Sequence, residues 1–396
     1  MKKILIPNGS FHDIPLIRTA KKLGFYVITS GAAPNGEGHK YADEYIYCDF
    51  SDKEMMLKIA RDRQIDAICS NCNDFGYLTA CYVAEHLGLP GHESYEHAVT
   101  LHHKDAFKKF AKQYDISTPP AESFADVQAA LRWCESQVFP LIVKPSDLGA
   151  GQGICRVDDI NAAKTAIVEA WNQSKSKRIV IEPFINGSAH SFNAFIVDKK
   201  VAGFYSDNEY MLYTPYRVST SAGPADGIEQ ALPRLIHDTE LVARELELTD
   251  GLVHSQYIRD KNGKPHILEI TRRMSGDWYP YPEMEATGID WMKYIVKAQC
   301  GIDCSDFPRN RQQRGFTGRH CLNAMRTGKI KKLVLDKKLL LPYVYDKIIW
   351  GDNNFEITRK DKDYPGILFL KFPNRETQMY TMEHIMNLVN FQFERE

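Results

Sequence analysis

Short apolar runs alternate with stretches of helical periodicity over residues 1–95. Residues 4–6 and 26–28 are apolar runs of strand length. Residues 16–23 between them carry apolar side chains at helical spacing, and Gly24 follows as the expected C-cap. Strands that alternate with helices are typical of a doubly wound parallel sheet. We therefore predict an N-terminal parallel α/β domain over residues 1–95.

Polar side chains occupy the turns that follow the predicted strands. Ligands of an open parallel sheet bind beyond the carboxyl ends of its strands. The turn residues expected at this edge are Asn8, Ser10, Asn71, Asn73 and Asp74. We name Asn73 and Asp74 as candidate substrate contacts, although an ordinary turn uses the same residue types.

The pattern changes beyond the first domain. In residues 96–186 the pattern predicts a linker helix and then a small unit. The expected order of elements in this unit is helix, strand, glycine-rich loop, strand, helix and strand. Residues 187–396 have a mixed α/β pattern. Within them, the apolar runs 253–258 and 266–270 flank an Asn-Gly pair at 262–263, which is a strong signal for a β-hairpin. The predicted fold class is therefore α/β, in three parts.

Composition and charge exclude several classes of protein. The formal net charge is -1, so a strongly basic face for nucleic acid is not expected. No apolar run approaches the ~20 residues that span a bilayer, and Pro7 and Gly9 end the first apolar run too early for a signal peptide. The nine cysteines are odd in number and dispersed, which favours reduced thiols. We expect a cytoplasmic protein without nucleic-acid or membrane partners.

The most distinctive segment is the glycine-rich stretch at residues 140–157. Gly149, Gly151 and Gly153 let backbone N–H groups approach an anion closely. The stretch is not a P-loop, because Ile-Cys follows the last glycine, and its spacing does not match a dinucleotide fingerprint. By itself it could be a plain turn. The functional hypothesis is a hairpin tip over phosphates, with Lys144 reaching inward from the preceding strand.

Three further segments stand in a fixed order around this loop: Lys104, residues 179–187 (IVIEPFING) and residues 265–276 (PHILEITRRMSG). The ordered set resembles the ATP-grasp superfamily, which includes biotin carboxylase, the carbamoyl phosphate synthetase large subunit and D-alanine–D-alanine ligase. The resemblance extends over nearly the whole chain, and residues 328–391 look like the C-terminal part of biotin carboxylase. It implies an ATP-grasp fold with an N-terminal parallel-sheet domain, a small lid and a mixed α/β C-terminal domain.

The resemblance implies an ATP site. Lysines at the positions of Lys104 and Lys144 contact phosphates in the family, and the hinge after the lid holds adenine. Ala189 stands where the family often has a ribose-binding glutamate, so His190 or Ser191 is a candidate to replace it. The implied nucleotide-binding residues are Lys104, Lys144, Ser146, Gly149, Gly151, Gly153, Glu182, Pro183, Phe184, Ile185 and His190.

A magnesium site is also implied, with Mn²⁺ as an alternative ion. Glu269 matches the family's bridging glutamate, whereas Gln256 stands where a carboxylate is usual and Thr271 where an asparagine is usual. Both replacements keep an oxygen donor. We therefore expect Glu269, Gln256 and Thr271 to hold the metal more weakly than usual. Asp260 and Asp277 are candidates to compensate.

Arg273 matches the family arginine that contacts the transferred phosphoryl group, and a fixed guanidinium suits such an oxyanion. Arg272 beside it is expected to form a surface ion pair. The implied catalytic residues are Arg273, Lys144 and Glu269. The candidate substrate contacts are Arg217, Arg319, Asn73 and Asp74.

The favoured reaction is ATP-dependent activation of a small-molecule carboxylate as an acyl phosphate, followed by attack of an amine to form an amide. One alternative is an enzyme that phosphorylates bicarbonate or carbamate, which would need a partner chain. Another is a non-catalytic ATP-binding regulator, which Gln256, Thr271 and Ala189 favour. The sequence leaves a homodimer open and identifies neither the carboxylate nor the amine.

Overall fold

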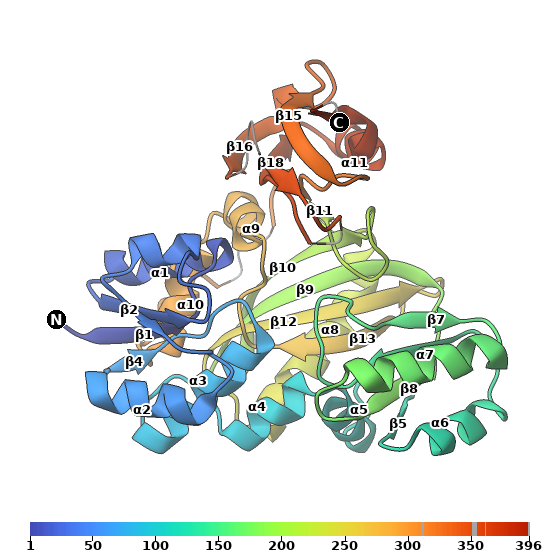
Figure 1. The fold of residues 1–396 in the computed structure, drawn as a ribbon, viewed down its shortest axis with the longest axis horizontal. Helices are drawn as coiled ribbons and strands as arrows, with labels where there is room; N and C mark the ends of the chain where they lie inside the picture. The colour runs from blue at the N-terminus through green and yellow to red at the C-terminus, as the bar shows by residue number, and fades with distance from the viewer. Residues whose placement is uncertain (310–312, 351–354, 361, 395–396) are drawn as a thin grey trace.

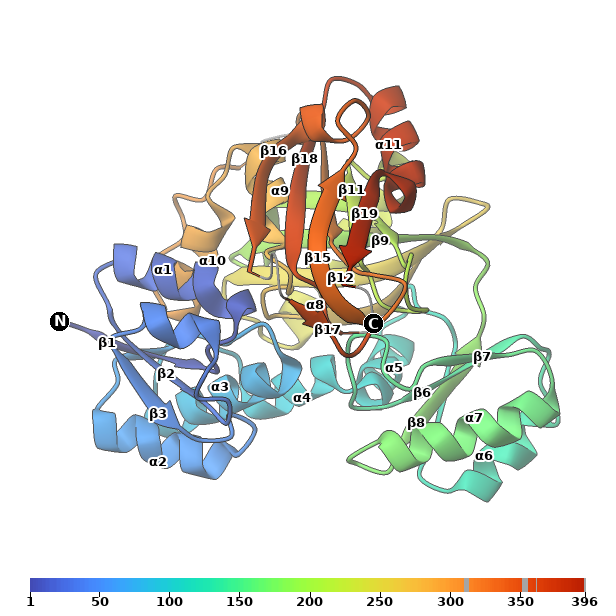
Figure 2. The ribbon, with the colours of Figure 1, turned by 45° about the horizontal axis from the view of Figure 1, so that its top comes forward.

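The computed structural model describes residues 1–309, 313–350, 355–360 and 362–394. A large twisted sheet occupies the middle of the molecule. An N-terminal unit and a small lid unit lie at opposite ends of the longest axis (Figure 1 and Figure 2). The C-terminal residues lie at the top of Figure 1 and come forward in Figure 2. In the described ranges, no helix is long and apolar enough to cross a membrane.

The N-terminal unit is a parallel sheet in the order β3-β2-β1-β4. Its strands are β1 (Lys3–Pro7), β2 (Tyr26–Gly31), β3 (Glu44–Tyr47) and β4 (Ala67–Ile68). One face packs against α1 (Ile14–Lys22), and the other packs against α2 (Lys53–Arg63) and α3 (Asp74–Leu87). Burial on both faces explains why these strands are short continuous apolar runs. The predicted doubly wound parallel sheet is confirmed.

Two linker helices, α4 (Tyr95–His102) and α5 (Lys104–Gln113), lead into the lid. The lid is an antiparallel sheet in the order β5-β8-β6-β7 with its own apolar core. Its strands are β5 (Glu122–Phe124), β6 (Leu141–Pro145), β7 (Cys155–Val157) and β8 (Ile179–Pro183). Helices α6 (Val127–Cys134) and α7 (Ile160–Gln173) cover it.

The central sheet has the order β13-β12-β9-β10-β11-β14-β18-β16 among the described residues. Neighbouring strands of this sheet pair antiparallel throughout the described residues. Its strands are β9 (Gly187–Val197), β10 (Lys200–Tyr210), β11 (Thr220–Gly223), β12 (Gly251–Asp260), β13 (Pro265–Thr271), β14 (Phe316–Cys321), β16 (Val344–Ile349) and β18 (Gly366–Phe372). The hairpin predicted around residues 262–263 is confirmed by β12 and β13.

Helices cover the central sheet on both sides. Helix α8 (Ile228–Glu245) packs against one face, whereas α10 (Trp291–Gln299) joins the other face to the N-terminal sheet in one continuous core. The remaining elements are α9 (Pro280–Thr287), α11 (Arg375–Leu388), β15 (Gly328–Leu335), β17 (Glu356–Ile357), β19 (Val389–Phe393) and the short 3-10 turns η1 (Phe11–Asp13), η2 (Glu37–Tyr41) and η3 (Leu341–Tyr343). The domain boundary that we propose between residues 186 and 187 immediately precedes β9.

Arg272, directly after β13, is buried at 3% exposure, so its predicted surface ion pair is wrong. Its guanidinium donates to the carbonyl oxygens of Leu252 (2.7 Å) and Thr249 (2.6 Å). Its Nε lies 3.6 Å from a carboxylate oxygen of Glu93, which is also buried. The side chain therefore links the central sheet to the segment that follows the N-terminal unit.

Replacing Arg272 with alanine should lower the melting temperature strongly. The change leaves the Glu93 carboxylate buried without its countercharge, which costs about 3–5 kcal/mol in comparable buried pairs. Thermal unfolding followed by circular dichroism measures the effect. Arg244→Ala is the matched control, because Arg244 is exposed on α8 and its loss should change stability by about 0.5 kcal/mol or less. Equal melting temperatures of the two variants would contradict the structural role of Arg272.

Candidate functional site

A cavity of about 300 Å³ lies where the lid loop, the central sheet and the N-terminal unit meet. The lid contributes Lys144 and the tip of the glycine-rich loop, and the N-terminal unit contributes His12 and Cys72. The central sheet lines the floor with polar side chains from β10, β12, β13 and β14. These are Glu209, His254, Gln256, Glu269 and Arg319. The site residues predicted from the sequence that line the cavity are Lys104, Lys144, Gly149, Gly151, Arg217, Gln256, Glu269, Arg273 and Arg319.

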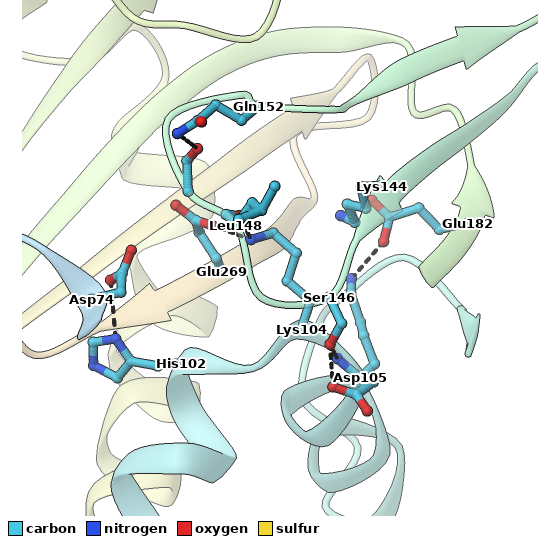
Figure 3. Close-up of polar contacts among 12 residues, drawn as sticks. Asp74, His102, Lys104, Asp105, Lys144, Ser146, Leu148, Gln152, Glu182 and Glu269 are labelled. Atoms are coloured by element: carbon cyan, nitrogen blue, oxygen red, sulfur yellow. Dashed lines mark hydrogen bonds and ion pairs between the residues drawn. The ribbon is translucent and has the colours of Figure 1, made fainter. Parts of the chain in front are cut away.

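Three buried lysines lie near the lid side of this cavity, and two of them, Lys104 and Lys144, line it. Lys144 on β6 lies 2.5 Å from one oxygen of Glu182, and Lys108 on α5 lies 2.9 Å from the other. Lys104, one turn before Lys108, donates to the Leu148 carbonyl (2.7 Å) and lies 3.4 Å from Glu269 (Figure 3). In this part of the described chain, three ammonium groups thus share two carboxylates. The surplus positive charge favours an anion in the cavity.

Lys108 was missed by the sequence analysis, although its spacing from Lys104 places both on one face of α5. Burial lowers the pKa of Lys108 to about 8, and Glu182 only partly opposes this. Burial alone would raise the pKa of Glu182, but Lys108 and Lys144 hold it below its usual value. Glu182 is therefore ionised and fully engaged by the two lysines.

The glycine-rich loop arches over the cavity with left-handed backbone at its tip. Ala150, Gly151 and Gly153 have φ values of 54°, 73° and 69°. A Cβ added at Gly151 would lie 2.4 Å from the carbonyl oxygen of Tyr216. Ser146, by contrast, is buried and donates its hydroxyl to Asp105, away from the cavity (Figure 3). The loop backbone, rather than Ser146, therefore faces the cavity.

The segment after Glu182 leads away from the main cavity. Phe184 and Ile185 line a second, more open pocket of about 570 Å³, together with the β12–β13 hairpin. His190 is fully buried on the opposite side of β9, where it bonds Ser188 (2.6 Å) and stacks on Tyr257. Burial lowers its pKa to about 4. The structure therefore does not support His190 as a nucleotide contact, since the cavity wall at this point is Ala189.

Two of the candidate metal ligands, Glu269 and Gln256, lie together on the cavity floor, whereas Thr271 lines a small separate cavity that also includes Glu269. Glu269 on β13 is directly opposite Gln256 on β12, and Thr271 lies two residues further along β13. Burial alone would raise the pKa of Glu269, but Lys104 and Arg273 hold it below its usual value. The Thr271 hydroxyl is buried without a hydrogen-bond partner. These are oxygen donors of the kind that Mg²⁺ prefers.

A site made of side-chain carboxylates, imidazoles or thiols alone is not formed. No group of three or more His, Cys, Asp or Glu side chains that could hold a metal is present in the described ranges. Asp260 bonds His266 (3.0 Å) in the hairpin turn, beside the second pocket. Asp277 faces the cavity but pairs with Arg319 (3.3 Å). Asp260 is therefore not placed to compensate for the missing carboxylate.

Arg273 faces the cavity and is fixed by Asp74. Its Nε lies 2.9 Å from one Asp74 oxygen, and the same oxygen lies 3.0 Å from Nδ1 of His102 (Figure 3). Burial alone would raise the pKa of Asp74, but Arg273 holds it well below its usual value. Asp74 thus holds the Arg273 guanidinium in position through this ion pair. Asn73 accepts from the Phe75 N–H (2.9 Å) as the N-cap of α3, so the structure does not support it as a substrate contact.

Two arginines also line the cavity. Arg319 on β14 is buried and lies 3.3 Å from Asp277, which is also 3.3 Å from His12. Arg217 lines the cavity from the segment between β10 and β11. His12 was missed by the sequence analysis because its turn precedes α1, far from every motif. Two guanidinium groups on the cavity wall are suited to an anionic substrate group.

Glu209 on β10 was also missed. It lines the cavity and accepts a hydrogen bond from Nε2 of Gln256 (2.7 Å). Burial, together with the nearby Asp207, raises the pKa of Glu209 to about 8. Two acidic residues at alternate positions of one strand are the signal that could have identified it, since both then point to the same sheet face.

Comparisons with known proteins agree with this architecture. The family model described as phosphoribosylglycinamide synthetase, ATP-grasp (A) domain, matches residues 102–212. Phosphoribosylamine–glycine ligase of Lactococcus lactis subsp. lactis is 34% identical over 98 residues, 25% of this chain and 24% of that protein. The same enzyme of Haemophilus influenzae is 24% identical over 289 residues, 68% of this chain and 66% of its own. The matched regions thus span a quarter to two thirds of these relatives.

Solved structures are similar over essentially the full length. L-amino acid ligase from Bacillus licheniformis has a TM-score of 0.81 at 18% identity, covering 100% of this chain and 99% of its own. Phosphoribosylglycinamide synthetase from Anaerococcus prevotii has a TM-score of 0.78 at 20% identity, covering 99% and 100%. The fold of the chain is the ATP-grasp fold of these structures. The ATP-grasp resemblance that the sequence motifs predicted is confirmed by the family model over residues 102–212.

Gly151→Val should impair turnover more than folding. A β-branched residue disfavours the positive φ and collides with Tyr216, so the loop is held away from the cavity. We expect ADP formation to fall about tenfold or more, a barrier increase of ~1.4 kcal/mol.

Gly24→Val is the matched control for backbone strain. Gly24 also has a positive φ, 87°, but lies outside the cavity with no heavy atom within 4 Å of an added Cβ. Melting temperature and ADP release are measured on both variants. Normal ADP release by folded Gly151→Val would show that the loop does not act on the nucleotide.

Proposed function

We propose that this protein is an ATP-dependent ligase that activates a small-molecule carboxylate as an acyl phosphate and joins it to an amine. The observation that carries the proposal is the cavity's charge arrangement. Lys104 and Lys144 line the cavity at the glycine-rich loop, and Arg217 and Arg319 add two guanidinium groups to its wall. Two anionic groups can thus be held in one cavity, with Arg273 also on its wall.

The lid side would bind the triphosphate. Lys104 and Lys144 supply point charges, and the loop around Gly151 supplies backbone N–H groups. Glu269, Gln256 and Thr271 would hold Mg²⁺, which when bound neutralises charge on the phosphate oxygens. Arg273, fixed by Asp74, would stabilise the charge of the transferred phosphoryl group.

The two arginines would bind the carboxylate. Arg319 and Arg217 can orient it so that a carboxylate oxygen attacks the γ-phosphorus and ADP leaves. The amine then attacks the acyl carbon, phosphate leaves and the amine loses a proton. The enclosure of the cavity limits hydrolysis of the acyl phosphate. The substrates of this chain are thus proposed to be one carboxylate and one amine.

Two other functions are kept as experimental alternatives. Carbamoyl phosphate synthase large chain of a Thermoanaerobacter strain is 26% identical over 243 residues, 57% of this chain and 21% of its own, which favours a carbamate-phosphorylating enzyme. The neutral Gln256 and Thr271 favour a regulator that binds ATP without turnover. ADP formation separates both ligase-type reactions from the regulator, and the substrate that elicits ADP separates the two reactions.

ATP with magnesium should raise the melting temperature. A ligand at a hundredfold excess over its dissociation constant stabilises the folded state by ~2.7 kcal/mol. Lys144→Ala should reduce this shift, because the variant loses a phosphate contact while Lys108 still neutralises Glu182. Lys164→Ala is the control, since Lys164 is exposed on α7. Absence of any shift in the parent, or equal shifts in both variants, would contradict the proposed nucleotide site.

Glu269→Gln should separate nucleotide binding from chemistry. The change keeps the side-chain shape but removes the charge that attracts the metal, whereas the lysines remain. We expect ADP formation to fall about a hundredfold, equivalent to ~2.7 kcal/mol in the barrier, with part of the thermal shift retained. ADP release is followed over a magnesium titration with a panel of carboxylate and amine pairs. Parent-like turnover by Glu269→Gln would rule out the metal assignment.

A further inference from the structure

Glu209 belongs to the same face of the central sheet as the candidate metal ligands. Gln256 pairs with Glu269 on one side and with Ser191 on the other, and Ser191 pairs with Asp207 of β10. Directly opposed residues of antiparallel strands share a face, as do residues two apart. Glu209, two residues after Asp207, therefore points to the cavity, whose lining includes it.

The Glu209 side chain crosses β9 to reach Gln256. Its carboxylate accepts a hydrogen bond from Gln256 Nε2 at 2.7 Å, although one strand lies between β10 and β12. On that intervening strand the cavity is lined by Ala189, whose methyl group leaves the space open. The Ser191 hydroxyl is turned to Asp207 (2.6 Å) and does not compete for Gln256. The small residue at 189 thus makes the contact geometrically available.

The contact fixes which end of the Gln256 amide faces the cavity. A glutamine amide has an oxygen that can bind a cation and an NH₂ group that cannot, and the two ends have nearly the same shape. In the structure the NH₂ end donates to a carboxylate oxygen of Glu209 (2.7 Å), so the contact holds this end of the amide. With Nε2 held by Glu209, the amide oxygen of Gln256 is the end left for a metal ion beside Glu269.

We propose that Glu209 is a positioning residue of the metal site: it orients the Gln256 amide so that its oxygen, with Glu269, binds the nucleotide-associated cation. The inference rests on the proposed function, since it needs a metal–nucleotide complex in this cavity. It assigns a role to a strand that supplies none of the residues matched to the family motifs. A neutral glutamine, which could present either end, becomes a defined oxygen ligand.

Binding of Mn²⁺ in the presence of ADP tests the role without requiring turnover. The free Mn²⁺ signal in electron paramagnetic resonance gives the affinity. Glu209→Met keeps the side-chain length but removes the acceptor, so the amide of Gln256 is free to turn. Loss of an outer partner of a metal ligand weakens binding about 10- to 100-fold. We expect a loss in this range.

The double variant Glu209→Met/Gln256→Glu separates positioning from a merely structural role. A carboxylate at 256 has two equivalent oxygens and needs no orienting partner, so it should restore the Mn²⁺ affinity. Asp226→Asn is the matched control: Asp226 accepts an identical amide hydrogen bond from Asn208 (2.8 Å), the neighbour of Glu209 on β10, but does not line the cavity. Its Mn²⁺ affinity should equal that of the parent.

The outcomes distinguish this inference from the proposed function. Parent-like Mn²⁺ affinity in Glu209→Met, or no recovery in the double variant, overturns the positioning role alone when the parent binds Mn²⁺–ADP and Glu269→Gln weakens that binding. A parent that binds neither Mn²⁺–ADP nor ATP overturns both. Weak binding in Glu209→Met that Gln256→Glu restores, with an unchanged Asp226→Asn, supports the inference.

Discussion

The buried carboxylate of Glu182 is the constraint on which the lid side of the cavity depends. It lies at 3% exposure between Lys108 of α5 and Lys144 of β6. The linker helix α5 and the lid strands β6 and β8 are therefore connected through this one carboxylate. An ionised carboxylate without partners would be very costly at this depth. The two lysines neutralise it, and the lid sheet is thereby held at a fixed position relative to α5. Lys104, one turn earlier on the same helix, is placed over Glu269 of the central sheet as a consequence.

Charged side chains from several elements meet in the same cavity. The ammonium groups of Lys104 and Lys144 line the cavity where the lid meets the central sheet, whereas the guanidinium group of Arg319 lines it beside Asp277. Cationic groups from several elements can therefore attract anions to one cavity, and the Glu269 carboxylate among them suits a cation. Phosphoryl transfer between two anionic reactants is favoured by such a set of charges. The sequence alone shows only a net charge close to zero, because acidic and basic residues are nearly equal in number.

Local sequence rules predicted the elements that local physics determines. The Asn-Gly hairpin, the parallel N-terminal sheet and the glycine-rich loop follow from turn chemistry and periodicity. The ordered lysine, loop and strand motifs identified the superfamily. The sequence did not predict in which direction several polar side chains point. Arg272 and His190 are polar residues beside the site, yet tertiary packing turns both into the interior. Asn73 caps the N-terminus of α3, a role for which its short amide side chain is well suited.

The residues that differ from the family pattern are coupled through the sheet, which no linear motif could show. Ala189, Glu209 and Gln256 are far apart in sequence but belong to three adjacent strands, β9, β10 and β12. A large acidic side chain at 189 would occupy the space that Glu209 crosses, and a carboxylate at 256 would repel Glu209 instead of donating to it. Alanine at one position and glutamine at the other remove both conflicts. The residues at 189 and 256 therefore both favour the contact between Glu209 and Gln256.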